Sequence, residues 1–338
     1  MAGDYSYYGS SFSFSTSNSS SNVVKCPGPS TAIITGVSVM CVVGAFGIVS
    51  NLALFLIPFL MKAFRTSPNA LVTNLALADF LYLIVNAPFS IEHELFPCFQ
   101  FGLIMCKIQN GFTVTTQAVT VFSLTAGAIE RHFALLSRNP QSTSWNIVIF
   151  TICTIWAISL FLSIPTVLAS HTVRDILCVP LPLFETSAKL HETLRFLFLY
   201  LLPLVIIAWC YTAIFRELQN SRQLTSKIYQ SRHLQQARKR SAFVFLSIIT
   251  LFAVCYLPYF VYNFIFHFLS ELFGDSNRTY FVTLDVLRVV SQIAVFLRAC
   301  LDPCAILIIS TKHRRAIKRM WNTLAFNLRG AHSSQRAG

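Results

Sequence analysis

Charged residues are scarce in this chain, making up 12% of its 338 residues, whereas roughly a quarter is usual in soluble domains. Hydrophobic residues make up 54%, and Phe occurs 31 times. This composition argues against a soluble protein and favours a chain embedded in a lipid bilayer. The formal net charge of +13 could suggest a nucleic-acid partner, but the bases lie between apolar segments and not on one soluble face. No nucleic-acid partner is therefore expected.

The signatures of several enzymes and transporters are missing as well. No segment contains a His-Glu-x-x-His helix or a Gly-x-Ser-x-Gly elbow, and Asp79 and Asp302 are the only acids well inside apolar segments. Internal repeats and paired broken helices, which are common in transporters, are not visible. We therefore expect no enzymatic activity, no cofactor and no metal. A transporter or channel is the less favoured alternative.

Seven segments are apolar and long enough to cross the hydrocarbon core, which takes about 20 helical residues. The third and seventh are the least apolar, as expected of helices that face the interior of a bundle. The predicted fold is an all-α membrane protein with a seven-transmembrane helix bundle over residues 32–310. The predicted spans are 33–61, 70–91, 106–135, 147–169, 194–215, 241–269 and 281–309.

The basic residues indicate which way the bundle faces. Glu217 is the only acid among seven bases between spans five and six, and the residues after span seven contain bases but no acid. These segments should be cytoplasmic, which places the N-terminus outside. The sequons at Asn18 and Asn277 both fall on the predicted outer face, where glycosylation is possible. Residues 1–30 contain no basic start followed by an apolar core, so we expect span one to direct membrane insertion.

The two ends of the chain differ in pattern. Residues 1–31 are rich in Ser and cannot bury enough apolar surface to fold alone, so a disordered extracellular tail is expected. Residues 311–338 alternate bases with apolar residues, which predicts a short amphipathic eighth helix on the inner leaflet and a short cytoplasmic tail. Membrane lipid is therefore an expected partner of this segment.

Each predicted span contains a short distinctive motif. In chain order the motifs are Asn51; Leu75-Ala76-Leu77-Ala78-Asp79 and Pro88; Cys106 and Glu130-Arg131-His132; Trp156 and Pro165; Pro203 and Tyr211; Phe252 and Cys255-Tyr256-Leu257-Pro258; and Asp302-Pro303. In order and spacing this series resembles the rhodopsin-like (class A) family of G-protein-coupled receptors. Pro88 and the loop around Cys178 are similar to the peptide-receptor branch, such as galanin or bombesin receptors.

The resemblance implies a multi-pass receptor of the plasma membrane that passes a signal from an extracellular ligand, expected to be a peptide, to heterotrimeric G proteins. It also implies a disulfide between Cys106 and Cys178 at the outer face. At the cytoplasmic end it implies that Glu130 pairs with Arg131 and that activation releases this arginine. The other residues implied in coupling and switching are Tyr211, Tyr256, Pro258, Asp302 and Pro303.

The resemblance also locates a ligand pocket. Thr113 stands where an amine-binding member would carry an Asp, so an amine ligand is not expected. The predicted wall is polar and aromatic with one fixed positive charge, which suits either a peptide or a small acid. It consists of Asn110, Thr113, Gln117, Tyr259, Asn263, Arg288 and Gln292, with Tyr256 beside them.

A second arginine, Arg298, lies deep in span seven, where the family pattern does not lead us to expect one. It precedes Asp302 by four residues, so the two side chains share one face of the helix. Asp79 and Thr120 should face the same region, which holds a sodium ion in many members of the family. We hypothesise that Arg298 bridges the two carboxylates and replaces sodium. The alternative is that Arg298 points toward lipid or toward a neighbouring carbonyl.

Three departures from the family pattern leave another output open. His132 replaces the usual aromatic residue after Arg131, Tyr256 replaces the usual Trp of span six, and Ile306 replaces the Tyr expected after Pro303. A receptor-like protein that signals constitutively, or without G proteins, is therefore the main alternative within the same fold.

Overall fold

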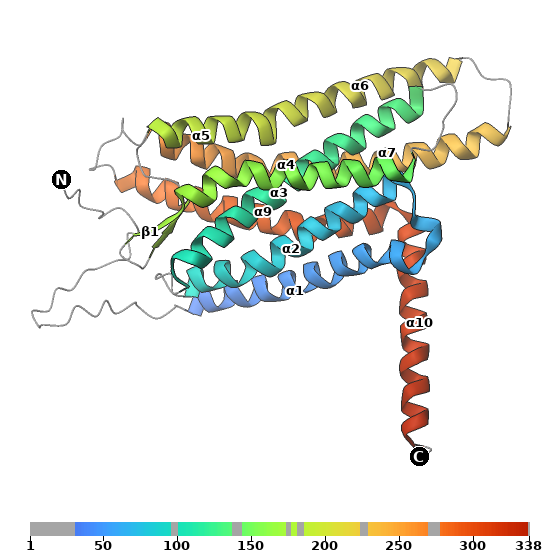
Figure 1. Cartoon of the computed structure of the whole chain (residues 1–338), viewed down its shortest axis with the longest axis horizontal. Coiled ribbons are helices and arrows are strands. Elements are labelled where there is room, and N and C mark those ends of the chain that lie inside the picture. The colour runs from blue at the N-terminus through green and yellow to red at the C-terminus, as the bar shows by residue number, and fades with distance from the viewer. Residues whose placement is uncertain are drawn as a thin grey trace, which may run out of the picture.

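The computed structural model describes residues 31–95, 101–136, 144–173, 177–180, 186–223, 229–269 and 278–336 (Figure 1). Within these ranges the chain is almost entirely helical and includes one two-stranded sheet. Residues 1–30 of the expected outer tail and the asparagines of both sequons lie outside the described residues. The elements are α1 (Thr31–Leu60), η1 (Lys62–Phe64), α2 (Ser67–Leu95), α3 (Gly102–Leu136), α4 (Trp145–Ala169), β1 (His171–Val173), β2 (Leu177–Val179), α5 (Thr186–Phe196), η2 (Leu197–Leu201), α6 (Leu202–Gln223), α7 (Tyr229–Phe264), η3 (Ile265–Leu269), α9 (Arg278–Ile309) and α10 (Thr311–Arg336).

Seven helical stretches in the described part of the chain are long and apolar enough to cross a membrane, which confirms the predicted fold class. The fifth combines α5, η2 and α6, and the sixth combines α7 and η3. The stretches are Val37–Leu60, Asn69–Glu92, Gly102–Ala134, Trp145–Ala169, Thr186–Glu217, Ala242–Leu269 and Val286–Ile309.

The fifth stretch begins at Thr186, eight residues before the predicted start at 194. The apolar pattern misplaced this boundary because the added turns contain Lys189, His191 and Glu192. Glu192 is nevertheless buried, together with Arg195 one turn further along the helix. A prediction based on apolar length therefore misses the first turns of this span, because they contain charged residues that are paired inside the bundle.

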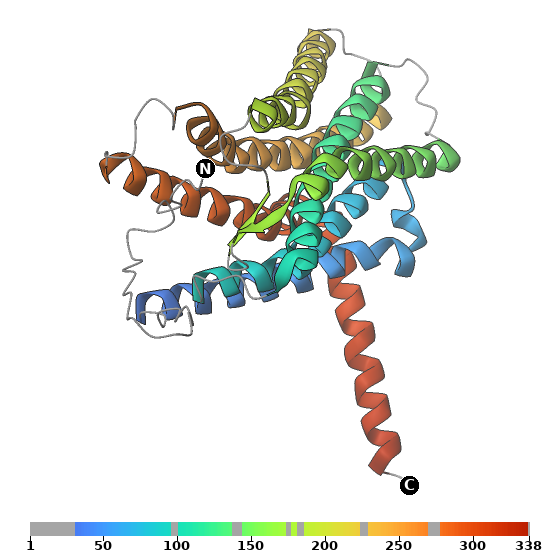
Figure 2. The ribbon, with the colours of Figure 1, turned by 60° about the vertical axis from the view of Figure 1, so that its left-hand side comes forward.

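The helices pack side by side around α3, as the two views in Figures 1 and 2 show. α3 is the most buried of the seven stretches and contacts α2, α4, α6 and α7, whereas α4 is the least buried. α9 packs mainly against α7 and α1. This arrangement brings residues of α2, α3, α7 and α9 to one shared interior.

Prolines lie inside five of the long helices. Internal positions are Pro58 in α1, Pro88 in α2, Pro165 in α4, Pro258 in α7 and Pro303 in α9. Such positions are tolerated in a membrane bundle because neighbouring groups satisfy the freed carbonyl. Pro203 lies near the start of α6, but the π-helical turn η2 runs directly into α6, so this proline too is internal to a continuous helical span.

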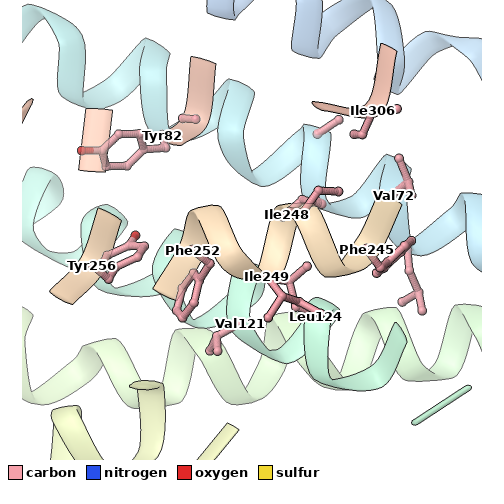
Figure 3. Packing of buried hydrophobic residues seen from close by; sticks show 14 of the residues in the cluster. Val72, Tyr82, Val121, Leu124, Phe245, Ile248, Ile249, Phe252, Tyr256 and Ile306 are labelled. Carbon is pink, nitrogen blue, oxygen red and sulfur yellow. The ribbon is translucent and has the colours of Figure 1, made fainter. Parts of the chain in front are cut away.

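An apolar core lies between α3 and α7 in the half of the bundle that is predicted to be cytoplasmic (Figure 3). Val121 of α3 lies beside Phe252 of α7 there, and Leu124 of α3 lies beside Ile249 of α7. Ile306 of α9 is 1% exposed and belongs to the same core. The residue that replaces the family's usual Tyr therefore serves as apolar packing.

The helix α10 extends away from the bundle after Ser310, in both views. His313 anchors its first turn. The His313 ring packs edge-on against Phe64 at 5.1 Å, and its Nδ1 lies 2.7 Å from the Ser310 hydroxyl. Burial, with a smaller contribution from the charge of Lys312, lowers the pKa of His313 to about 4. The predicted eighth helix is thus present, and its contact with lipid remains a prediction.

Candidate functional site

A disulfide between Cys106 of α3 and Cys178 of β2 fixes the outer end of the bundle, with their Cα atoms 5.6 Å apart. This pairing confirms the prediction. β2 pairs antiparallel with β1, so the bridge holds the whole hairpin against α3. Asn110 secures the same corner, because its side-chain amide donates to the Ser170 hydroxyl at 3.1 Å.

Several residues of the predicted ligand wall are engaged in holding the helices. Thr113 donates to the side-chain oxygen of Asn86 at 2.8 Å, which ties α3 to α2. Asn263 donates to the Tyr259 carbonyl within its own helix, at 2.8 Å. On α9, Arg288 is half-buried and Gln292 is exposed. These hydrogen bonds hold the helices, and the ligand wall itself stays a prediction.

Gln117 and Tyr259 do come together, through an arginine that the sequence did not single out. Arg195 of α5 is 8% exposed, and its guanidinium donates to the Gln117 Oε1 atom at 2.8 Å and to the Tyr259 hydroxyl at 2.5 Å. Glu192 accepts from the same guanidinium at 3.4 Å. We name these four residues the outer cluster. Its sequence signal is the spacing of Glu192 and Arg195, three residues apart on one helix face.

The outer cluster retains unused hydrogen-bonding capacity. Within the described residues, the Gln117 Nε2 and Glu192 Oε2 atoms are buried without a hydrogen-bond partner. Buried polar groups are usually satisfied, so such atoms mark places where a further group can bind. The His191 Nδ1 atom lies 3.7 Å from the Glu192 carboxylate at the outer side. This combination can recognise polar groups of a ligand that enters from outside.

The internal polar site brings two acids together with a base. Arg298 of α9 donates to Asp79 of α2 at 2.6 Å and to Asp302, one turn further along α9, at 2.8 Å. All three side chains are at most 1% exposed. Thr120 is buried as well, on α3. We name Arg298, Asp79 and Asp302 the internal triad; its geometry is the bridge that the sequence led us to expect.

Backbone contacts hold the internal triad in register. The Asn51 side chain of α1 donates to the Ala299 carbonyl of α9 at 2.8 Å, next to Arg298. A Cβ atom at Gly47 would lie 2.6 Å from the Cys300 sulfur, so a glycine is required for α1 to approach α9 this closely. In the part of the chain that the structure describes, no group of three or more His, Cys, Asp or Glu residues is placed to hold a metal ion.

The cytoplasmic end departs from the expected arrangement. The ion pair expected between Glu130 and Arg131 is not formed in the described part of the chain, where the Glu130 Oε2 atom has no hydrogen-bond partner. Adjacent residues of a helix do not face each other, which explains the separation. Arg131 instead donates to the Gly127 carbonyl at 2.6 Å, and its guanidinium lies 3.2 Å from the centre of the Phe245 ring.

The contact between Arg131 and Phe245 joins α3 to α7, and we name it the cytoplasmic latch. Gly127 makes room for it, because a Cβ atom there would lie 2.5 Å from the Phe245 ring and 3.0 Å from the arginine. Tyr211 adds a second link, since its hydroxyl donates to the Ala242 carbonyl of α7 at 3.2 Å. His132, the departure next to Arg131, packs against Trp209 of α6 with ring centres 4.8 Å apart.

A bundle of seven membrane-spanning helices with a disulfide-tethered outer hairpin, a buried polar interior and an arginine latch at one end defines a membrane receptor. Residues 50–305 match the family described as 7 transmembrane receptor (rhodopsin family), and the chain belongs to this family.

Three relatives cover most of the chain. It is 28% identical over 299 residues to the neuropeptide Y receptor type 1 of Xenopus laevis, covering 84% of this chain and 79% of that receptor. It is 30% identical to the bombesin receptor subtype-3 of Ovis aries, covering 82% and 72%. It is 26% identical to the neuropeptide CCHamide-1 receptor of Drosophila melanogaster, covering 81% and 57%.

Proposed function

We propose that this receptor binds an extracellular peptide and activates heterotrimeric G proteins from the plasma membrane, with its N-terminus outside. The relatives support the ligand class, because their names refer to neuropeptide Y, bombesin and CCHamide-1. The basic segments between spans five and six and after span seven support the orientation. The cytoplasmic latch is the observation that carries the proposed output.

The latch gives a physical route to G-protein activation. Arg131 is 6% exposed and is held between the Gly127 carbonyl and the Phe245 ring. An outward movement of α7 would remove the ring and expose the guanidinium at the cytoplasmic end of α3. A buried cation is costly in a membrane protein unless it has a function or a partner. Release of Arg131 is therefore the step that we assign to activation.

The internal triad is a separate part of this proposal. Arg298 supplies a permanent positive charge between Asp79 and Asp302. One terminal nitrogen of its guanidinium donates to each carboxylate, at 2.6 Å and 2.8 Å respectively. A sodium ion in the same space would meet a fixed guanidinium. We therefore propose that Arg298 replaces sodium and that the stability of the inactive state does not depend on this ion.

Ile306 supports the alternative output. It fills the apolar core at 1% exposure, and the Tyr211 hydroxyl is bonded to the Ala242 carbonyl. An active state that relies on a hydroxyl at position 306 is therefore unavailable to this receptor. Constitutive signalling, or signalling through another effector, is the second candidate function.

A second-messenger panel tests the proposed function directly. Cells expressing the wild-type chain or the Arg131→Ala variant at equal surface density would be exposed to a peptide library, with untreated cells as the baseline. We expect at least one peptide to change a second messenger in wild-type cells and to have no effect in Arg131→Ala cells. Equal responses in both would contradict the role of Arg131. Basal signals that no peptide changes would favour the constitutive alternative.

A further inference from the structure

Two buried arginines lie over two tyrosines of the same helix. The Arg195 guanidinium of the outer cluster lies 5.0 Å from the centre of the Tyr259 ring, and that of Arg298 in the internal triad lies 5.6 Å from the centre of the Tyr256 ring. Both distances are within the range of a cation–π interaction, which is strongest when the cation is desolvated. Tyr256 and Tyr259 are three residues apart on α7, so they share one face of the helix.

The two tyrosines contact each other directly. Their ring centres are 6.4 Å apart and their planes make an angle of 85°, which is the edge-to-face arrangement that aromatic quadrupoles favour. Arg195, Tyr259, Tyr256 and Arg298 therefore form a continuous series of contacts, which we name the column. It begins at Glu192 on the outer side and ends at Asp79 and Asp302 in the middle of the bundle.

The upper end of the column has the weaker ion pair. Arg195 donates to the neutral acceptors of Gln117 and Tyr259 at 2.8 Å and 2.5 Å. Its carboxylate partner Glu192 lies 3.4 Å away, whereas charge-assisted hydrogen bonds are usually about 2.7–2.9 Å long. Arg298, in contrast, has contacts of 2.6 Å and 2.8 Å with its two carboxylates. A group that binds at the outer side can therefore shift Arg195 more readily than the internal triad can rearrange by itself.

A shift of Arg195 cannot leave Tyr259 unaffected. The guanidinium both donates to the Tyr259 hydroxyl and lies over its ring. Tyr259 and Tyr256 are closely packed, the latter being 3% exposed, and a close-packed interior transmits displacement because there are no voids to absorb it. Tyr256 in turn covers the arginine of the internal triad.

We propose that Arg195 and Arg298 are energetically coupled through Tyr259 and Tyr256, so that a ligand that engages the outer cluster biases the internal triad. Arg195 is thus a positioning residue for the internal triad. The ligand part of this inference rests on the proposed function, and the coupling itself does not. Among the described residues Arg195 and Arg298 share no hydrogen-bond partner, and the column is the route of side-chain contacts between them.

A double-mutant cycle tests the coupling without a known ligand. The receptor in lipid nanodiscs would be compared as wild type, Arg195→Gln, Arg298→Lys and the double variant. Arg298→Lys keeps a cation between the carboxylates but loses the forked geometry. The readouts are the midpoint of thermal unfolding and basal nucleotide exchange on G proteins. Because the first readout needs no G protein, failure of the proposed function and failure of the coupling are distinguishable.

We expect the double variant to differ by threefold or more from the product of the single effects on exchange. Independent sites combine to within about twofold. In the thermal readout, the shift of the double variant should differ clearly from the sum of the two single shifts. Additive effects in both readouts would overturn the proposal. If Arg195→Gln does not yield folded receptor, Arg195→Lys replaces it. Lysine keeps the charge but lacks the two guanidinium nitrogens that contact Gln117 and Tyr259 at the same time.

Variants of the aromatic residues identify the route. Tyr256→Phe keeps the ring and should preserve the coupling, whereas Tyr256→Leu should reduce it to the level of independent sites. Phe260 is the matched control, because it packs against both tyrosines but has no cation–π contact with either arginine among the described residues. Phe260→Leu should therefore leave the coupling intact. Coupling that survives Tyr256→Leu, or that is lost in Phe260→Leu, would overturn the column.

Discussion

Arg298 of α9 donates to Asp79 of α2 at 2.6 Å, across 219 residues of sequence and between side chains that are at most 1% exposed. The contact links α2 to α9 inside the bundle. With Asp302 as the second acceptor, the guanidinium uses both of its terminal nitrogens on carboxylates. The positive charge between the two carboxylates thus comes from a side chain of the receptor and not from an ion in the medium.

Sodium should therefore have little effect on this receptor. We expect the midpoint of thermal unfolding and the basal rate of nucleotide exchange to be the same in NaCl and in KCl at constant ionic strength. A guanidinium already occupies the position between the two carboxylates, so a sodium ion would gain no free pair of ligands there. A marked dependence on sodium in the wild type would contradict the proposed replacement.

Removal of the guanidinium should be severely destabilising. Arg298→Gln leaves two buried carboxylates without their cation, and breaking a buried charge group typically costs about 3–5 kcal/mol. Adding Asp79→Asn to the same chain should recover part of this loss, because one of the uncompensated charges is then absent. Thermal unfolding in nanodiscs measures the loss of stability in Arg298→Gln and its recovery in the double variant. A double variant less stable than Arg298→Gln alone would count against the bridge.

The outer disulfide should behave as a single unit. Cys106→Ser and Cys178→Ser should each lower surface delivery, because the bridge restrains a long loop of the unfolded chain and typically contributes about 2–4 kcal/mol. The double variant should be no worse than either single variant. Surface labelling of intact cells provides the comparison, and clearly additive losses would argue against the pair.

The docking of α10 should weaken in acid. The pKa of His313 is about 4 in the docked helix, while an unperturbed histidine titrates near about 6.5. Between these pH values His313 binds a proton when α10 is undocked but stays neutral when α10 is docked. Docking is therefore lost as the pH falls from about 6.5 toward 4. Hydrogen exchange in the first turn of α10 should rise over this range.

His313→Phe provides the control for that measurement. Phenylalanine retains an aromatic contact with Phe64 but has no titratable group. The variant should show the same exchange in the first turn of α10 at neutral and at acidic pH. If the acid-induced increase persists in His313→Phe, another group controls the docking.

Features that repeat along one helix, or that join acids and bases within one turn, were predictable from the sequence. The seven spans follow from apolar length, and the contact between Arg298 and Asp302 follows from a spacing of four residues. The participation of Asp79 followed from the family resemblance. Contacts that depend on which helix faces meet were not predictable: Phe245 under Arg131 is one, and Gln117 and Tyr259 around Arg195 are others.

The outer cluster was missed for a further reason. A search for apolar windows ends a span where charges begin, and Lys189 and Glu192 therefore hid the outer end of the fifth span. The pairing of Glu192 with Arg195 makes that end compatible with burial. The expected pairing of Glu130 with Arg131 was wrong because neighbouring residues on a helix diverge, and the partner came from α7.

The cytoplasmic latch is tested most directly by nucleotide exchange on purified G proteins. Wild-type receptor in nanodiscs would be compared with Arg131→Ala and with Arg65→Ala. Arg65 is exposed on the same predicted side of the bundle, and its side chain donates to the Pro58 carbonyl. Each receptor would be presented with representatives of the G-protein classes, with and without the peptide library. We predict that the wild type and Arg65→Ala accelerate nucleotide exchange on at least one class of G protein. Arg131→Ala should not accelerate it, although a normal thermal-unfolding transition should show that this variant is folded. Equal exchange by Arg131→Ala, or no exchange by the wild type on any class, would contradict the account.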